Sequence, residues 1–286
     1  MPDHMLPGLH IKANTGESIL IDAGEGTQLQ LSKARISINR IDAILITHMH
    51  GDHVFGLPGL LENMSLTGRT KPLLLIGPRG LDDYLVNSFQ STYFAPRYKL
   101  YYLRVRGFGS TSIGKLRIEW FPACHTVEAY GYKVIYHKKP KLSKEKLAEK
   151  GLYNNPLTSK LLEKGWIKYK GKTITLEEVM KEPGREYCIA YTGDTAPCTW
   201  VLEAVSRCDL LFHEATFASD HKYEAWAYGH STAEDAALIA REAGVDKLVL
   251  YHYSTRYKEN YNVLLEEARK VFPHTELGAD LSEYTV

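Results

Sequence analysis

Residues 48–53 read His-Met-His-Gly-Asp-His and place three imidazoles and one carboxylate in a single short turn. Imidazole nitrogens with one carboxylate suit Zn²⁺, and less strongly Mn²⁺ or Fe²⁺. The apolar run 42–47 before the turn is typical of a buried strand, so the ligands stand where a strand ends and a loop begins. Gly51 is expected to let the backbone fold back so that Asp52 and His53 face a second metal. A solvated polar turn needs no such set, so we interpret this turn as a metal site.

Further side chains of the same chemistry follow four other apolar runs. They are His125 after 116–122, Asp194 after 187–191, His213-Glu214 after 209–212 and His252 after 247–251. A lone His at the end of a strand is more often a packed or surface residue. Because strand ends of one sheet meet at one rim, four such endings and the turn predict a shared site. Cys124 precedes His125, and neighbours in a strand point to opposite faces, so we assign Cys124 to the core.

Apolar runs and turn signals alternate along the chain and predict a sheet core covered by helices. The expected strands are 9–12, 18–22, 42–47, 72–76, 116–122, 130–136, 187–192, 209–212 and 247–251. The expected helices are 26–34, 55–65, 80–91, 232–243 and 260–271. For the helix 232–243, Ser231 and Glu234 have the spacing of a capping box, and Gly244 stands where a helix ends.

Composition places the chain among globular proteins that are neither secreted nor membrane-bound. With 286 residues, 44% hydrophobic and 24% charged, it can bury a large core. The N-terminus has no basic stretch followed by an apolar one, and no apolar run approaches the ~18 residues of a membrane span. The four cysteines are scattered, so we expect free thiols in a reducing cytoplasm: Cys124, Cys188, Cys198 and Cys208.

The net charge of +1 hides a basic segment. Residues 138–172 hold eleven Lys and three Glu, a net +8, which leaves −7 for the rest of the chain. Such a segment indicates a polyanionic partner, and the alternative is a solvated Lys-rich face of a heat-stable protein. Three short helices are expected in this region, the last with Thr175 and Glu178 as its capping box. Few apolar residues accompany them, so we expect an arm over 138–183 rather than a second core.

Several motifs occur together in a fixed order. They are Asp22-Ala-Gly-Glu-Gly26, the turn at 47–53 with Val54-Phe-Gly-Leu-Pro-Gly59, Thr192-Gly-Asp-Thr195, His213-Glu-Ala-Thr-Phe217, His230-Ser-Thr232 and His252-Tyr-Ser-Thr-Arg-Tyr257. In this order they resemble the ribonuclease Z family of the metallo-β-lactamase superfamily, endonucleases that trim the 3′ end of precursor tRNA. The resemblance implies an α/β fold, a four-layer αββα sandwich as a single domain over 1–286, with 138–183 as an inserted substrate-binding arm. The family begins with an apolar strand and a Gly-Thr-Gly turn, so we expect this first N-terminal strand to be missing.

The resemblance also implies a site with two divalent metal ions, Zn²⁺ or alternatively Mn²⁺. The ligands of the first ion would be His48, His50 and His125, those of the second Asp52, His53 and His252, with Asp194 as the bridge. Two such ions can clamp a phosphodiester and generate a hydroxide near neutral pH. Asp22 is expected to bond a ligand or a loop amide rather than a metal.

Other side chains take catalytic and substrate-binding roles by the same resemblance. Asp52 would also act as the general base. His230 would act at the leaving oxygen with Glu214 as its partner, because a carboxylate raises the pKa of an imidazole. The residues implied to contact substrate phosphates are Ser254, Arg256 and the arm lysines Lys138, Lys139 and Lys141.

The function that the resemblance implies is metal-dependent removal of the 3′ trailer from precursor tRNA, leaving a 3′-hydroxyl on the tRNA. The enzyme is expected to be a cytoplasmic homodimer that binds neither membranes nor DNA. One alternative is another binuclear hydrolase acting on small phosphodiesters. A second alternative, a non-catalytic RNA-binding relative, is disfavoured because a binding module gains nothing from seven converging ligands.

Overall fold

The computed structural model describes residues 6–286, which form two compact units. The first unit is the chain up to Ile135 together with Cys188–Val286, and the second, which we call the inserted unit, is Tyr136–Tyr187. The segment 138–183, expected to form an arm, lies within the inserted unit. Among the described residues, none of the helices has the length and apolarity needed to cross a membrane.

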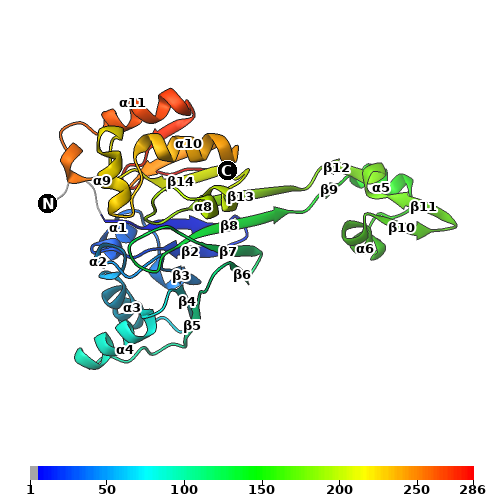
Figure 1. Ribbon diagram of the computed structural model, residues 1–286. Coiled ribbons are helices and arrows are strands. Elements are labelled where there is room, and N and C mark those ends of the chain that lie inside the picture. The colour runs from blue at the N-terminus through cyan, green and yellow to red at the C-terminus, as the bar shows by residue number, and fades with distance from the viewer. Residues whose placement is uncertain (1–5) are drawn as a thin grey trace. The chain divides into compact units, whose positions relative to one another are not determined.

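Two sheets form the centre of the first unit (Figure 1). One has the order β1-β2-β3-β4-β5, with strands Leu9–Lys12, Ser18–Ile21, Ala43–Leu45, Leu73–Gly77 and Leu100–Arg104. The other has the order β16-β15-β14-β13-β8-β7-β6. In chain order its strands are Gly109–Ile113, Leu116–Pro122, Tyr130–Lys138, Arg185–Tyr191, Leu210–Glu214, Lys247–Tyr251 and Thr275–Leu277. The strands β2 to β5 and β13 to β16 run parallel, so their carboxyl ends lie at common edges.

Helices cover the outer face of each sheet and produce four layers (Figure 1). Against the first sheet lie α1 (Thr27–Lys33), α2 (Gly51–Val54), α3 (Leu57–Leu66) and α4 (Leu81–Ser91). Against the second lie α8 (Thr199–Ala204), α10 (Ala233–Ala243) and α11 (Asn262–Val271). Because side chains alternate along a strand, Ile44 packs under the helices while Ala43 and Leu45, equally buried, face the other way. The expected αββα sandwich is confirmed.

Direct hydrogen bonds join the two sheets beside the turn at 48–53. The Tyr132 hydroxyl on β8 donates to the carbonyl of Ile46 at 2.8 Å, and the Tyr130 amide donates to the carbonyl of Thr47 at 3.0 Å. Both acceptors stand between β3 and the turn, so these bonds fix the turn against the second sheet.

All nine expected strands and five expected helices occur, with ends that differ by at most two residues. In the first unit, the expectation missed β5, β6, β16, α8 and α9 (Lys222–Ala227), together with the short helix α2 inside the metal-ligand turn. The sequence of β6 is Gly-Ser-Thr-Ser-Ile, which has no apolar run to reveal it. Its pairing with β7, rather than its own composition, makes it a strand.

The capping box of α10 lies one residue later than expected. The Thr232 hydroxyl accepts from the amide of Asp235 at 3.1 Å, and the Asp235 carboxylate accepts from the amide of Thr232 at 3.2 Å. Ser231 instead donates to the carbonyl of Thr195 at 2.6 Å. The expected pair, Ser231 with Glu234, was therefore wrong. Thr232 and Asp235 have the same spacing one residue later, so spacing alone does not distinguish the two pairs. Gly244 ends the helix with φ 64°, as expected.

The inserted unit has a small apolar core of its own, contrary to the expectation of an arm without one. The buried cluster comprises Leu147, Leu152, Leu161, Ile167, Ile174 and Val179. It is formed by α5 (Lys144–Glu149), α6 (Leu157–Lys164), the hairpin of β10 (Trp166–Tyr169) and β11 (Lys172–Thr175), and α7 (Leu176–Val179), while β9 (Lys141–Leu142) pairs with β12 (Met180–Glu182). Each element supplies one or two apolar residues, so no sequence window shows a run. With thirteen Lys and Arg against seven Glu, the unit carries a net charge of +6.

Cys188 and Cys208 form a disulfide, so the expectation of four free thiols was wrong for this pair. Cys188 lies on β13 and Cys208 precedes β14, and these parallel neighbours bring the two Cα atoms to 4.7 Å. A separation of 20 residues hides this neighbourhood in the sequence. Cys124 and Cys198 are free and half-buried.

Candidate metal centre

The turn at 48–53 begins where β3 ends and includes α2. His48 is fully buried, His50 is the residue before the first turn of α2, and Asp52 and His53 lie within it. Contrary to the expectation from the sequence, Gly51 does not fold the chain back through a left-handed conformation. A Cβ atom at this position would lie 2.2 Å from the ring of the exposed Phe55, so the glycine leaves room for that ring. The short helix, rather than a glycine reversal, separates the two groups of ligands.

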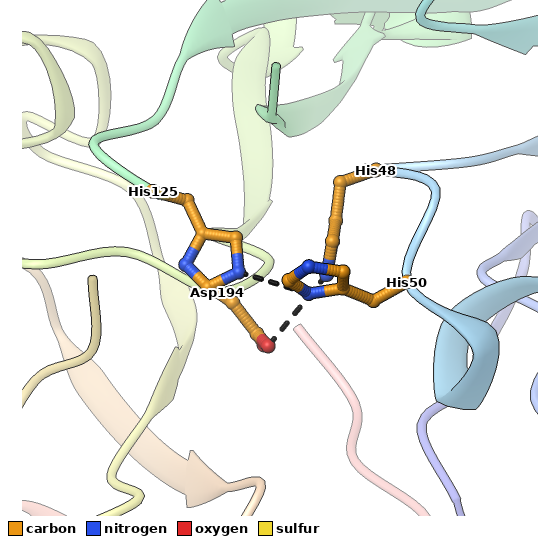
Figure 2. Close-up of side chains that lie close together, drawn as sticks. All are labelled: His48, His50, His125 and Asp194. Carbon is orange, nitrogen blue, oxygen red and sulfur yellow. Dashed lines mark hydrogen bonds and ion pairs between the residues drawn. The ribbon is translucent and has the colours of Figure 1, made fainter. Parts of the chain in front are cut away.

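One group of side chains consists of His48, His50, His125 and Asp194, which point toward one another (Figure 2). One ligand atom from each lies within 4.8 Å of all the others. His125 Nε2 is 3.1 Å from His50 Nδ1, and His48 Nε2 is 3.7 Å from Asp194 Oδ2. Ligand atoms of a tetrahedral Zn²⁺ with bonds of about 2.0–2.1 Å stand roughly 3.3 Å apart, so this spacing suits such an ion.

A second group consists of Asp52, His53 and His252, again with ligand atoms within 4.8 Å of one another. His252 Nε2 is 3.3 Å and His53 Nε2 is 3.7 Å from Asp52 Oδ2. His252 follows β15 of the second sheet, whereas Asp52 and His53 belong to the turn after β3 of the first. The ligands therefore meet between two sheets, not at the rim of one sheet as the sequence suggested.

Asp194 faces both groups. Its Oδ1 lies 3.4 Å from His53 Nε2, and its Oδ2 lies 3.7 Å from His48 Nε2 and 3.5 Å from His252 Nε2. Asp194 follows Thr192-Gly193 at the end of β13. Gly193 has φ 64°, and the side chain of Thr47 packs directly against it. One carboxylate thus lies within reach of the imidazoles of both groups.

Buried ligand atoms without hydrogen-bond partners test whether the site fits a metal. Within residues 6–286, His48 Nε2, His53 Nε2 and Asp194 Oδ1 are buried and accept or donate no hydrogen bond. Such orphaned atoms are costly unless something outside the protein binds them. All three point into the space that the two groups enclose, and nitrogen and carboxylate donors suit a divalent cation. The residues therefore fit a metal centre.

The protonation states of the cluster follow from burial and charge. Burial, aided by the charge of His53, lowers the pKa of His48 to about 2, so this imidazole stays neutral as a metal ligand must. Burial opposes ionisation of Asp194, but the charges of His252 and His53 outweigh it and lower its pKa well below the ordinary value. Burial also opposes protonation of His53, yet Asp194 and Asp22 raise its pKa. The carboxylates therefore create a field that favours a cation between them.

Hydrogen bonds orient the imidazoles from behind. Asp22 is fully buried and accepts from His53 Nδ1 at 2.8 Å and from the amide of Thr47 at 2.8 Å. His125 Nδ1 donates to the carbonyl of Gly229 at 2.7 Å. These bonds fix the ring nitrogen that faces the site, as outer-shell partners of metal ligands do. Asp22 bonds both a ligand and a loop amide, the two partners expected for it.

His230 and Glu214 form the pair that the sequence suggested. His230 Nδ1 is 2.9 Å from Glu214 Oε1 and 4.0 Å from Asp194 Oδ2. Burial opposes protonation, but the hydrogen bond to Glu214 and its charge raise the pKa of His230. Glu214 is fully buried and accepts from the amides of Thr195 and Thr216 at 3.0 and 3.1 Å, which keeps its carboxylate in place. Thr216, not singled out in the sequence, also lies 2.9 Å from His252 Nδ1.

The remaining predicted residues lie in two places. Ser254 and Arg256 follow His252, and the Ser254 hydroxyl accepts from the amide of Arg256 at 3.3 Å. The Arg256 guanidinium pairs with Glu224 through two contacts of 2.9 and 3.2 Å. The three lysines belong to the inserted unit: Lys138 and Lys141 lie 3.9 and 3.2 Å from Glu182, and Lys139 is exposed.

Two curated relatives decide the family. Ribonuclease Z of Ignicoccus hospitalis is 42% identical over 285 residues, covering 100% of this chain and 94% of that protein. Ribonuclease Z of Sulfolobus acidocaldarius is 40% identical over 279 residues, covering 98% and 92%. The chain belongs to the ribonuclease Z family. The resemblance seen in the sequence motifs is thereby confirmed over the whole chain.

Other comparisons agree on the fold of this ribonuclease Z family member. The family model of the beta-lactamase superfamily domain matches residues 170–253, and that of anti-Pycsar protein Apyc1 matches residues 9–143. The short form of human tRNase Z is similar with a TM-score of 0.69 at 23% identity, covering 99% of this chain and 93% of that one. YhfI of Bacillus subtilis, a metallo-β-lactamase fold protein, has a TM-score of 0.67 at 18% identity, covering 96% and 89%.

We expect the Asp22→Asn variant to bind metal roughly 10- to 100-fold more weakly, because an amide holds His53 and the turn less well than a carboxylate. Titration against a chromogenic chelator measures the affinity. Asp42→Asn is the matched control, since Asp42 accepts from the amide of Ser18 and pairs with Lys71 away from the ligands. Equal affinities in the two variants would show that Asp22 does not support the metal centre.

Proposed function

We propose that this chain is a metal-dependent endoribonuclease that removes the 3′ trailer from precursor tRNA and leaves a 3′-hydroxyl on the tRNA. One observation carries the proposal. In a member of the ribonuclease Z family, Asp194 faces both ligand groups, and His230, held by Glu214, stands 4.0 Å from it. A group that can act on the leaving oxygen therefore stands beside the residues that would hold the metal ions.

The seven ligands would hold two divalent ions, Zn²⁺ or alternatively Mn²⁺. His48, His50 and His125 would bind one, Asp52, His53 and His252 the other, and Asp194 both. When bound, such a pair neutralises the phosphate charge and supplies a nucleophile near neutral pH. All other steps fall to side chains of the chain itself.

Asp52 would act on the attacking water. Burial opposes its ionisation, but the hydrogen bond from His252 and the charge of His53 lower the pKa of Asp52 to about 2. The carboxylate is therefore ionised at neutral pH, and its side chain is 38% exposed. A carboxylate of such low pKa orients the water by accepting a hydrogen bond more effectively than it removes the proton.

His230 would act on the leaving 3′-oxygen. Glu214 fixes its Nδ1, which leaves the other ring nitrogen to donate toward the substrate. The charge that Glu214 contributes keeps the imidazole protonated to a higher pH than usual, because it raises the pKa, and a protonated imidazole stabilises or protonates a departing oxygen.

Substrate binding would involve Arg256 and Ser254 near the metals and the basic inserted unit. A guanidinium suits phosphate through its fork of donors, and lysines contribute affinity without reading sequence. We assign backbone binding to Lys138, Lys139 and Lys141. We further propose a cytoplasmic homodimer acting on RNA rather than DNA, which rests on the family resemblance.

A cleavage assay tests the function directly. Incubation of the metal-loaded protein with a 3′-extended precursor tRNA should yield a tRNA ending in a 3′-hydroxyl and a trailer beginning with a 5′-phosphate. A chelator should abolish the reaction, and Asp52→Ala should slow it by about 10²–10⁴-fold. Asp42→Ala serves as the carboxylate control. Absence of cleavage near the end of the acceptor stem by folded, metal-loaded protein would refute the proposal.

Glu214→Gln should change the pH dependence of the reaction. A group that acts in its protonated form is active below its pKa, and Glu214 raises the pKa of His230. Removing the carboxylate charge therefore lowers that pKa and moves the alkaline limb of the kcat profile to lower pH. The measurement is kcat across pH for parent and variant. An unchanged alkaline limb would mean that His230 does not act as an acid.

The basic inserted unit distinguishes the proposal from the alternative of a hydrolase for small phosphodiesters. Replacing the three arm lysines by Ala should weaken precursor cleavage and reduce the salt dependence of binding, by roughly 0.7–0.9 in slope for each phosphate that is no longer neutralised. Hydrolysis of bis(p-nitrophenyl) phosphate, which has no backbone to hold, should change far less. A charge-matched control in the first unit replaces the exposed Lys33, Lys99 and Lys115. An equal loss of precursor cleavage and of bis(p-nitrophenyl) phosphate hydrolysis would show that the three lysines have a structural role.

A further inference from the structure

Three exposed aromatic side chains stand directly before His230 in the sequence. Tyr223 and Trp226 lie on α9 and are 86% and 44% exposed, and Tyr228 follows the helix and is 59% exposed. Tyr223 and Trp226 are three residues apart, which places them on one face, with ring centroids 6.4 Å apart at 74°. Large aromatic rings left in solvent together usually serve a binding surface.

The segment that carries these rings is attached directly to the metal centre. The carbonyl of Gly229, next to Tyr228, accepts from the ligand His125 at 2.7 Å. A Cβ at Gly229 would lie 2.8 Å from His125 Nδ1, so the backbone packs against the ligand itself. The amide of His230 donates to the carbonyl of Ala225 within α9 at 2.8 Å. The position of α9 is thus coupled to that of the reacting groups.

The same helix is bonded to the arginine proposed to bind phosphate. Glu224 makes the two-contact pair with Arg256, whose guanidinium carbon lies 5.4 Å above the ring of Phe217. Trp226 is held by its Nε1, which donates to Asp235 at 3.0 Å, and Lys222 places its ammonium 5.1 Å from the same ring. Aromatic faces alternating with cations match a nucleic acid strand, in which bases alternate with phosphates.

We propose that Tyr223 and Trp226 form a stacking platform for the unpaired nucleotide on the tRNA side of the scissile phosphate. The inference rests on the proposed function and specifies where its substrate lies. His230 acts at the leaving 3′-oxygen, and that oxygen belongs to the last nucleotide of the tRNA. Because the platform leads directly into His230, the base of that nucleotide is the one within its reach. Stacking accepts any base, which suits an enzyme that processes many tRNAs.

Exposed aromatic rings of this kind can also bind a second copy of the chain. The bonds to His125 and Arg256 favour RNA, since a subunit covering α9 would also cover groups that must meet the substrate. Measurement of the oligomeric state of each variant distinguishes RNA from a second subunit as the partner of these rings.

The test combines protein variants with modified substrates. Tyr223→Leu should lower kcat/KM for a precursor tRNA by roughly 5- to 150-fold, the range of one stacked base, and far more than for bis(p-nitrophenyl) phosphate. Tyr223→Phe, which keeps the ring, should restore cleavage. Tyr101→Leu is the matched control, because Tyr101 is 53% exposed on β5, away from α9. Trp226→Leu should lower kcat/KM about as much as Tyr223→Leu does. Trp226→Phe keeps an aromatic ring but cannot donate to Asp235, so it distinguishes the effect of the ring from that of the hydrogen bond.

A substrate with an abasic site at the last tRNA nucleotide locates the stacked base. The parent should be slowed on this substrate about as much as Tyr223→Leu is slowed on the normal one, and Tyr223→Leu should be slowed no further, because the effects of contacting partners are not additive. The platform would be overturned if the slowing by Tyr223→Leu and the slowing by the abasic site multiplied. It would also be overturned if only abasic sites in the trailer slowed the reaction, or if the variants changed oligomeric state and lost both activities. Failure of the parent to cleave any precursor would instead refute the proposed function.

Discussion

The structure depends on one buried carboxylate placed among imidazoles from two different sheets. Asp194 is 2% exposed, and burial of a charge without compensation is prohibitively costly. Histidines of the turn after β3 approach it from one sheet, and His252 approaches it from the other. Both sheets must therefore end at the same place. The hydrogen bonds from Tyr130 and Tyr132 to the backbone before the turn maintain this alignment.

Around Asp194, two further buried carboxylates each hold one imidazole. Asp22 orients His53, and Glu214 orients His230. Asp22 and His252 both adopt left-handed backbone conformations, with φ of 59° and 58°. Non-glycine residues rarely adopt this conformation unless the surrounding structure imposes it, and such residues gather at functional sites. The two carboxylates and the strained backbone thus hold the imidazoles of the centre in position.

The sequence singled out the His and Asp side chains that the structure brings together, but it revealed less of the structure around them. The ligands could be recognised because each follows an apolar run, and local spacing alone reveals that pattern. Pairing across the fold cannot be seen locally. Cys188 meets Cys208 only because β13 and β14 are neighbours, and Thr232 rather than Ser231 caps α10 because a distant carbonyl, that of Thr195, accepts the Ser231 hydroxyl.

The inserted unit and α9 also show what the sequence alone could not predict, in this case how side chains pack and which of them stay exposed. The small core around Leu161 collects single apolar residues from several short elements, so hydrophobic periodicity has no window in which to appear. The aromatics of α9 were not singled out in the sequence, and their exposure on a segment bonded to His125 and Arg256 is what suggests a function for them. Composition identifies a residue's chemistry, and the fold decides which partner it meets.

A metal count on the parent and on Asp194→Ala, by elemental analysis after gel filtration, addresses the central role of this carboxylate most directly. Circular dichroism establishes that the variant is folded. The parent should carry two divalent ions per chain, and the variant should show marked loss of both, since Asp194 faces both ligand groups. A folded variant that keeps two ions, or a parent that binds fewer than two, would contradict a binuclear centre bridged by Asp194.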